Sequence, residues 1–410
     1  MVCMRYSLFS HCSSVHISLG TPCGFVNLLS DRSNDVAPLI RIMPTMSDHD
    51  DHSSGGPWRV SPWVHREAER LYRPLEGDEM LPTDPDYVKL RRLAEADAVL
   101  ETLDADGRRW LDEAWIEPVT LDRSQDYRLR YVSLETCSTC TQGCYFCPVG
   151  IAPRPTKLMP TELFETIVAQ LTAHRDTIEG VGLSNYNEPT ADRRFVDQVA
   201  LLHEHRLPPA VLSNASTFTP DKVDAVIELG GLVYLGINIS TTDRDRYKAD
   251  RGKDHLPRVL EHLDYMKDKE LAETMALVVL GHDDEAHHKE IAILEERFAG
   301  SNFVVRPFDI MDRAGWLDVG IGPAKPHTRL RGCENLGSRP LEHLHITAEG
   351  QVVFCCEDYD EVHTVGELTK QTVDEILSGD EMARLRRFAY GIDDAPEDFI
   401  CRNCLFALTD

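Results

Sequence analysis

The sequence predicts an α/β fold: a partial (β/α)6 TIM-like barrel with a helical N-terminal extension and a small C-terminal domain made of a β-hairpin and helices. Three observations support this fold. After residue 128, short segments rich in Val, Ile and Leu alternate with amphipathic segments, as buried parallel strands alternate with their crossover helices. Before residue 128, apolar residues recur at steps of three and four. Nine of the twelve cysteines lie at or after Cys137, in two groups.

The 410 residues are enough for two or three domains with a sizeable core. The N-terminal segment 1–56 is rich in Ser, has little charge at its start, and has neither an 18-residue apolar span nor a clear signal cleavage site. We expect it to be disordered, or to be wrongly assigned upstream of a true start at Met43 or Met46. The helical extension is predicted over 57–127, with helices at 64–71 and 87–103.

The barrel is predicted over 128–320 from six apolar segments, which are 129–134, 180–184, 210–213, 232–239, 275–280 and 303–307. The helices predicted between them are 160–174, 191–205, 220–229, 256–269 and 284–298. Successive β-α units imply a parallel sheet with right-handed crossovers, curved into a barrel or partial barrel.

Three cysteines follow the first predicted strand: Cys140, Cys144 and Cys147, in a C-x3-C-x2-C spacing. A [4Fe–4S] cluster normally takes four thiolates, so three leave one iron open to a small molecule. The alternative is a zinc site completed by Cys137, which stands at a C-x2-C distance from Cys140. The first βα loop lies on the barrel face where active sites occur, and this position favours a reactive cluster.

The cysteine spacing and its position resemble the radical S-adenosylmethionine (SAM) superfamily, over roughly residues 128–310. The resemblance implies that SAM chelates the open iron through its amino and carboxylate groups. It also implies reductive cleavage of SAM to methionine and a 5′-deoxyadenosyl radical, with a reductase or a flavodoxin- or ferredoxin-type protein as electron donor.

Asn187 and Glu188, followed by a proline, resemble the end of the family's G-G-E-P segment, which holds the SAM amino group. An acidic side chain is a suitable partner for an ammonium group. The alternative is an ordinary helix N-terminus, where Glu and Pro are both favoured.

Two further segments, which follow the third and fourth predicted strands, resemble SAM-binding segments of the family. Ser213 and Asn214 resemble an S/T-N-G segment near the methionyl and ribose groups. The resemblance makes Ser240 a ribose contact and Arg251 a carboxylate contact, and it places Phe146 near the adenine. Ser and Asn after strands are also common turn and cap residues.

The residues after 320 contain a second cysteine group: Cys333, Cys355, Cys356, Cys401 and Cys404. An alternating segment at 345–354 with a Glu-Gly turn predicts a hairpin, and 372–377 and 381–388 are predicted helices. The pattern over 321–410 resembles the SPASM/Twitch auxiliary-cluster domains. It implies a second [4Fe–4S] cluster held by Cys333, Cys355, Cys401 and Cys404, with Cys356 as an alternative to Cys355. Four thiolates also suit zinc.

The resemblance to Twitch-type enzymes favours oxidation of an aminocyclitol or sugar-like metabolite, with the auxiliary cluster accepting an electron. Epimerisation is the alternative, and Cys356 or Cys137 would then return a hydrogen atom. Arg306, Asp309 and Asp312, near the end of the sixth strand, are candidate substrate contacts.

Peptide modification, as in ribosomal-peptide or sulfatase maturation, is a second possibility. Peptide-modifying relatives often carry an N-terminal winged-helix module with a three-stranded sheet, so the predicted helical extension favours a small molecule. A zinc- or cluster-stabilised scaffold or redox sensor is the non-catalytic alternative.

The chain is strongly acidic, with 69 Asp and Glu against 43 Lys and Arg and a net charge of −26. This charge argues against nonspecific binding to nucleic acid or to anionic membranes. Cysteines at metal-ligand spacing must stay reduced, so we expect a cytoplasmic protein.

Overall fold

The computed structural model of the chain describes residues 56–410, and its centre is a nine-stranded sheet. The order of its strands is β12-β11-β10-β9-β8-β7-β14-β15-β16. The expected disorder of the N-terminal segment and the alternative starts at Met43 and Met46 lie outside the described residues.

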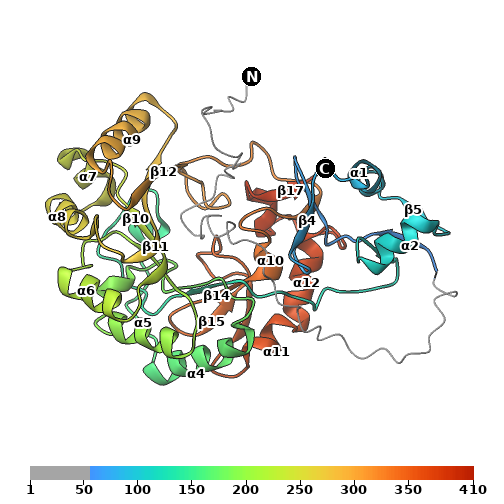
Figure 1. Cartoon of the computed structure of the whole chain (residues 1–410), viewed down its shortest axis with the longest axis horizontal. Helices are drawn as coiled ribbons and strands as arrows, with labels where there is room; N and C mark the ends of the chain where they lie inside the picture. The colour runs from blue at the N-terminus through green and yellow to red at the C-terminus, as the bar shows by residue number, and fades with distance from the viewer. Residues whose placement is uncertain (1–55) are drawn as a thin grey trace.

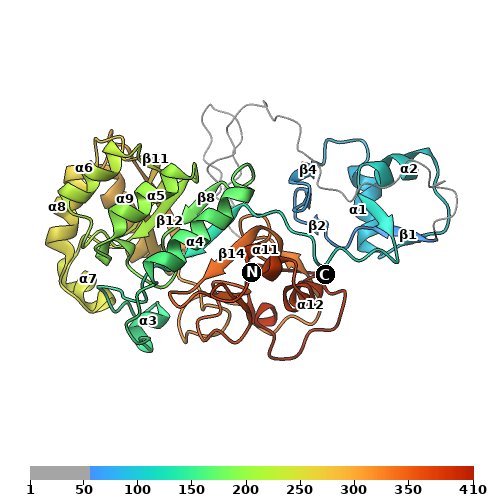
Figure 2. The same cartoon turned by 90° about the horizontal axis from the view of Figure 1, so that it is seen from below.

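Six consecutive parallel strands form the barrel part of this sheet: β7 (Tyr131–Leu134), β8 (Gly180–Gly182), β9 (Pro209–Ser213), β10 (Leu232–Asn238), β11 (Ala272–Gly281) and β12 (Phe303–Asp309). Helices cover the outer face (Figures 1 and 2): α4 (Thr161–Leu171), α5 (Phe195–Glu204), α6 (Pro220–Glu228), α7 (Arg244–Arg251), α8 (Leu256–Met266) and α9 (Glu285–Arg297). The prediction of a partial barrel is confirmed.

Side-chain alternation explains how the sheet builds its core. Val132 and Leu134 belong to the large apolar cluster shared with the outer helices. Tyr131 lies on the opposite, inner face, where it packs with Ala210 and Tyr234. Because successive side chains of a strand point to opposite faces, the inner face is available for the polar residues at the strand ends.

The C-terminal segment extends the barrel sheet. Strand β14 (His343–Ile346) pairs in parallel with β7, and β15 (Gln351–Val353) and β16 (Thr364–Glu367) follow in antiparallel pairing. Gly350 has a φ of +81° in the β14–β15 turn, a conformation that glycine adopts without strain. The predicted hairpin is therefore also the continuation of the barrel sheet.

Shorter elements surround this hairpin. They are α10 (Arg339–Glu342), α11 (Val373–Leu377), α12 (Asp380–Ala389), the 3-10 helix η3 (Ile400–Asn403), and the antiparallel pair β13 (Leu330–Cys333) and β17 (Ala407–Thr409). They bring the first and last cysteines of the C-terminal group to the same end of the hairpin.

The extension differs from its prediction. It has two helices, α1 (Tyr87–Glu95) and α2 (Ala105–Asp112), and two three-stranded antiparallel sheets. One sheet contains β5 (Val99–Leu100), β1 (Trp58–Val60) and β6 (Ile116–Pro118), and the other contains β2 (His65–Arg66), β3 (Leu71–Arg73) and β4 (Asp78–Met80). The helix predicted at 64–71 is wrong, because strand pairing overrides its helical spacing of apolar residues.

The extension packs against the C-terminal elements (Figure 2). His65 Nε2 lies 2.7 Å from the hydroxyl of Tyr390 on the α12 side. The hydroxyl of Tyr72 donates a hydrogen bond of 2.8 Å to buried Glu342, which also forms a 2.8 Å ion pair with Arg130. These buried polar contacts join the extension, the barrel and the C-terminal segment.

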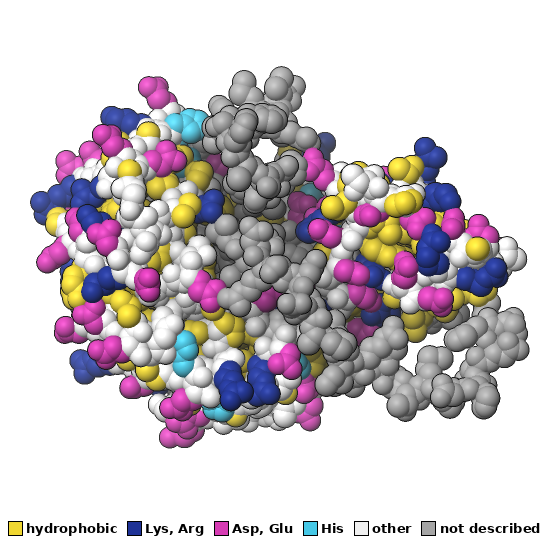
Figure 3. All heavy atoms as spheres, in the orientation of Figure 1, with side chains coloured by type: hydrophobic (Ala, Val, Ile, Leu, Met, Phe, Trp, Pro, Cys, Tyr) yellow, Lys and Arg dark blue, Asp and Glu magenta, His cyan; other side chains and the backbone are white. Residues whose placement is uncertain are grey.

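Acidic side chains are interspersed with basic ones over the visible face of the barrel (Figure 3). Within residues 56–410, the helices are too short or too polar for any to cross a lipid bilayer.

Candidate functional site

The loop that carries Cys140, Cys144 and Cys147 follows β7, at the carboxyl end of the parallel strands. The end of α7 holds this loop through its backbone. Gly143 N donates to Arg251 O at 2.9 Å, and a Cβ on Gly252, whose φ is +65°, would lie 3.0 Å from Gly143 O. Glycine is therefore required at position 252 both by φ and by the close approach of the cysteine loop.

Two of the three thiols have hydrogen-bond donors from the predicted SAM-binding segments. Asn214 Nδ2 lies 3.8 Å from Cys140 Sγ, and Arg251 Nη1 lies 3.9 Å from Cys144 Sγ. Burial raises the pKa of both thiols, and the charge of Arg251 opposes this rise at Cys144. Donors of this kind stabilise the thiolate form that metal coordination needs.

Arg251 is 1% exposed and is the central cation of the site. Its Nη2 donates to Asn238 Oδ1 at 2.6 Å and to Ser240 Oγ at 2.8 Å. Its guanidinium lies 5.1 Å from the centre of the Phe146 ring. Its Nε is buried without a hydrogen-bond partner in the described part of the chain. A bound carboxylate would satisfy this donor, so the site fits the carboxylate of SAM.

Glu188 is also fully buried, but its carboxylate is already occupied by donors of the protein. Oε1 accepts from the backbone and hydroxyl of Thr190 and from Ser213 Oγ, and Oε2 accepts from Asn214 N at 2.7 Å. Burial raises its pKa, and these donors oppose the rise. In this geometry Glu188 ties the loop after β8 to the loop after β9.

Asn187 and Cys137 lie beside each other next to the cysteine loop. Asn187 Nδ2 is 3.8 Å from Cys137 Sγ, and Asn187 Oδ1 accepts from Asn185 N at 2.9 Å. Cys137 is 1% exposed, and its thiol also lies 3.8 Å from Thr139 O. The thiol of Cys137 is therefore enclosed by its own loop and by Asn187.

The three residues predicted as substrate contacts lie at or after β12, an edge strand of the large sheet. Arg306 is partly buried, and its Nε has no hydrogen-bond partner among residues 56–410. Burial raises the pKa of both Asp309 and Asp312. Asp312 lies in the segment that leads from the barrel to the C-terminal elements.

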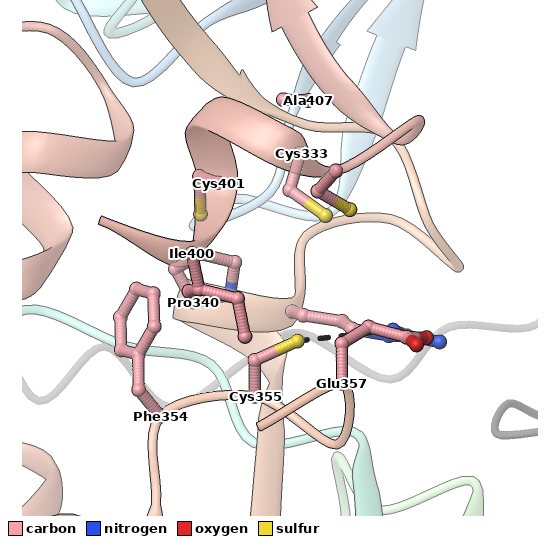
Figure 4. Close-up of a pocket in the computed structure, with 10 residues that line it drawn as sticks. Cys333, Pro340, Phe354, Cys355, Glu357, Ile400, Cys401 and Ala407 are labelled. Carbon is pink, nitrogen blue, oxygen red and sulfur yellow. Dashed lines mark hydrogen bonds and ion pairs between the residues drawn. The ribbon is translucent and has the colours of Figure 1, made fainter. Parts of the chain in front are cut away.

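Four members of the second cysteine group line one cavity (Figure 4). The four cysteines that line it are Cys333, Cys355, Cys401 and Cys404. No three His, Cys, Asp or Glu side chains within 56–410 converge closely enough to hold one metal ion. Four thiolates at one cavity are the ligand set of a [4Fe–4S] cubane, so these residues fit such a cluster.

Cys356 does not line this cavity. It is fully buried, and its thiol hydrogen-bonds Cys355 and lowers the pKa of that residue. Burial raises the pKa of the other three thiols, that of Cys333 to about 11. Cys355 is therefore the member of the pair that faces the cavity.

Sequence reasoning missed the charged residues at this cavity. Arg339, which is 1% exposed, places Nη1 3.8 Å from Cys355 Sγ and 3.0 Å from Glu357 Oε1. Arg313 lies 3.3 Å from the other oxygen of Glu357. Glu357 follows the two cysteines directly, which was an available signal, whereas no local pattern marked the arginines.

Several contacts connect the segments that flank the two cysteine sites. Tyr186, immediately before Asn187, donates a 2.6 Å hydrogen bond to the carbonyl of Cys356. Arg154, in the segment after the cysteine loop, lies 3.0 Å from Glu361 and stacks 4.2 Å from the ring centre of Tyr359. These contacts join the loops after β7 and β8 to the segment that follows Cys355.

Family models match both parts of the chain. The radical SAM superfamily model matches residues 134–293, and the SPASM model, described as an iron–sulfur cluster-binding domain, matches residues 333–405. These matches replace the zinc interpretation with iron–sulfur clusters and support SAM as cofactor. A search of curated proteins found no match.

Among solved structures, Streptococcus suis SuiB bound to the precursor peptide SuiA has a TM-score of 0.51 and 11% identity, covering 85% of this chain and 93% of SuiB. BtrN in complex with AdoMet and 2-DOIA has a TM-score of 0.46 and 20% identity, covering 68% of this chain and 94% of BtrN. Native anSMEcpe with bound AdoMet has a TM-score of 0.47 and 11% identity, covering 67% and 89%. The SuiB likeness supports the fold. The two family models lead to one conclusion: the chain carries a radical SAM domain over residues 134–293 and a C-terminal SPASM iron–sulfur domain over residues 333–405.

Proposed function

We propose that the chain oxidises a substrate by two electrons, and that the substrate is a hydroxyl-bearing, aminocyclitol- or sugar-like metabolite. When bound, the open-iron cluster with SAM supplies the 5′-deoxyadenosyl radical that removes a hydrogen atom, and the auxiliary cluster supplies a one-electron acceptor. We further propose a reductase or a flavodoxin- or ferredoxin-type donor for the first cluster.

In this proposal Cys140, Cys144 and Cys147 hold the first cluster. Arg251 binds the SAM carboxylate, with Asn238 and Ser240 fixing the guanidinium.

Asn187 and Asn214 present amides near the cysteine loop. Phe146, packed against Arg251, shields that side from water. Glu188 positions the SAM-binding residues by joining the loop after β8 to the loop after β9.

One observation carries the oxidation: four protein thiols line the auxiliary cavity. A cluster with four protein ligands has no open iron for substrate, so its role is electron transfer. The hydrogen bond from Tyr186 to Cys356 gives the two sites a short connection.

Epimerisation has less support, because it needs a thiol that can reach the substrate. Cys356 is 0% exposed and Cys137 is 1% exposed. Cys356 hydrogen-bonds Cys355, and Cys137 contacts Asn187 and a backbone carbonyl.

Peptide modification is the second candidate, and one observation favours it. The extension contains the three-stranded sheet β5-β1-β6 rather than helices alone, so the argument that favoured a small molecule is removed. Peptides commonly bind by adding a strand to the edge of such a sheet. The likeness to SuiB, whose structure contains a precursor peptide, covers 85% of the chain.

The test is anaerobic turnover with SAM and dithionite, using panels of deuterated aminocyclitols, sugars and peptides. Oxidation predicts deuterium in 5′-deoxyadenosine and a product two hydrogens lighter than the substrate. Failure to form 5′-deoxyadenosine with any substrate would favour the non-catalytic alternative. A product of unchanged mass and inverted configuration would favour epimerisation, and reaction of peptides alone would favour the second candidate.

A further inference from the structure

The four-cysteine cavity contains a buried cation that coordination does not require. Arg339 lines the cavity with the cysteines and with apolar residues that include Pro340, Phe354 and Ile400. Its Nη1 lies 3.8 Å from Cys355 Sγ. A guanidinium is almost always charged, so this contact brings a positive charge to a cluster ligand in an environment without bulk water.

The carboxylate beside this cation is shared with a second arginine. Glu357 is the anion in contact with Arg339, at 3.0 Å, but it also pairs with Arg313 at 3.3 Å. Among the described residues, the two arginines therefore share the Glu357 carboxylate. Burial and the charge of Arg339 together lower the pKa of nearby His345 to about 3.

The reduction potential of an iron–sulfur cluster depends on its net charge, on hydrogen bonds to its sulfurs and on its exposure to solvent. Reduction adds one electron, so a cluster with four thiolates becomes more negative by one unit. A buried positive charge that donates a hydrogen bond to a thiolate stabilises this reduced form more than the oxidised form.

We propose that Arg339 is a positioning residue that raises the reduction potential of the auxiliary cluster, so that the cluster accepts an electron more readily. The inference rests on the proposed electron-acceptor role of the cluster and names the side chain that tunes it. The negative charge of Glu357 opposes the rise in potential caused by Arg339. Arg313 also pairs with Glu357 and so weakens this opposition.

The experiment measures the midpoint potential of the auxiliary cluster in the full-length, anaerobically purified protein. Cys140, Cys144 and Cys147 are all changed to Ala in the background, so that only the auxiliary cluster contributes to the electron paramagnetic resonance signal. Arg339→Gln is expected to weaken reduction at least tenfold, a shift of at least 59 mV towards negative potential for a one-electron couple.

Matched variants separate tuning from structural damage. Arg339→Lys keeps the positive charge. Its midpoint potential is therefore expected to shift by less than half as much as that of Arg339→Gln. Arg384→Gln makes the same change at a position 49% exposed on α12 and is expected to leave the potential unchanged. Glu357→Gln removes the opposing anion and is expected to shift the potential in the positive direction.

An unchanged potential in Arg339→Gln with full iron content overturns the proposal. If Arg339→Gln fails to hold iron, Glu357→Gln decides, and a zero or negative shift there overturns it. None of these measurements uses a substrate. The potentials can therefore shift as expected in a protein that never oxidises a substrate. That result would refute the proposed function and leave the tuning role of Arg339 intact.

Discussion

The carboxylate of Glu188 provides the most direct test of how the SAM-binding loops are built. If Glu188 only contacts SAM, its replacement has no effect on the cofactor-free protein. The structure instead gives it protein donors on both oxygens, including Ser213 Oγ and Asn214 N, both at 2.7 Å. Glu188→Gln is therefore expected to destabilise the protein even before any cofactor is added.

The magnitude follows from the donor count. An amide NH2 replaces one acceptor oxygen and must face a donor, either the Asn214 N–H or the donors of Thr190 and Ser213. Leaving a buried donor unsatisfied costs about 1–3 kcal/mol, and the misplaced NH2 group adds a similar cost, so we expect about 3 kcal/mol in total. With an unfolding entropy of about 2.1 cal/mol/K per residue over roughly 350 residues, this lowers the melting temperature by about 4 °C.

The assay is thermal unfolding of the cluster-free protein, followed by SAM titration of the reconstituted protein. Glu228→Gln, on the exposed surface of α6, is the matched control and is expected to leave both unchanged. In Glu188→Gln the SAM dissociation constant is expected to rise at least about tenfold, equivalent to 1.4 kcal/mol. A cluster-free melting temperature within 1 °C of the parent, together with lost SAM affinity, would refute the positioning role and restore a direct SAM contact.

Three further predictions concern Arg251, Glu135 and the auxiliary cluster. Arg251→Lys loses the paired contacts to Asn238 and Ser240, so SAM affinity is expected to fall at least about tenfold, and equal affinity in a titration would contradict the assigned contact. Burial raises the pKa of Glu135 from 4.5 to about 7, so its proton stabilises the fold below pH 4.5 and this contribution, about 3 kcal/mol, is lost as the pH rises through 7. Glu135→Gln should abolish that part of the pH dependence in denaturant titrations between pH 5 and 8, and an unchanged slope counts against it. Cys401→Ala should reduce iron from about eight to about four atoms per chain and still allow 5′-deoxyadenosine formation, and retention of eight irons would exclude Cys401 as a ligand.

Most of the barrel was predictable because its elements have local periodicity. The strand expected at 232–239 is β10 (Leu232–Asn238), and the helix expected at 220–229 is α6 (Pro220–Glu228). Buried parallel strands are continuously apolar and their helices are amphipathic, so each element is marked by its own residues.

The N-terminal extension was less predictable for the opposite reason. Its strands are two or three residues long, and each is stabilised by pairing rather than by its own pattern. Apolar residues at 64, 68 and 71 fit helical spacing, but Leu71 pairs with Arg66 and Met80 in a sheet.

For the candidate site, the sequence by itself determined which chemical groups are present: a three-cysteine loop after the first barrel strand, a later four-cysteine set, and polar residues at successive strand ends. Ligand spacing and strand alternation are local properties, so they can be recognised in the linear sequence. Only the tertiary structure decided which of these groups contact one another. The pairing of β14 with β7 joins the C-terminal segment to the barrel sheet, Glu188 bonds across two loops, and Arg339 lies against Cys355. These arrangements depend on the pairing of residues far apart in the chain and on the burial of charge, neither of which local sequence patterns encode.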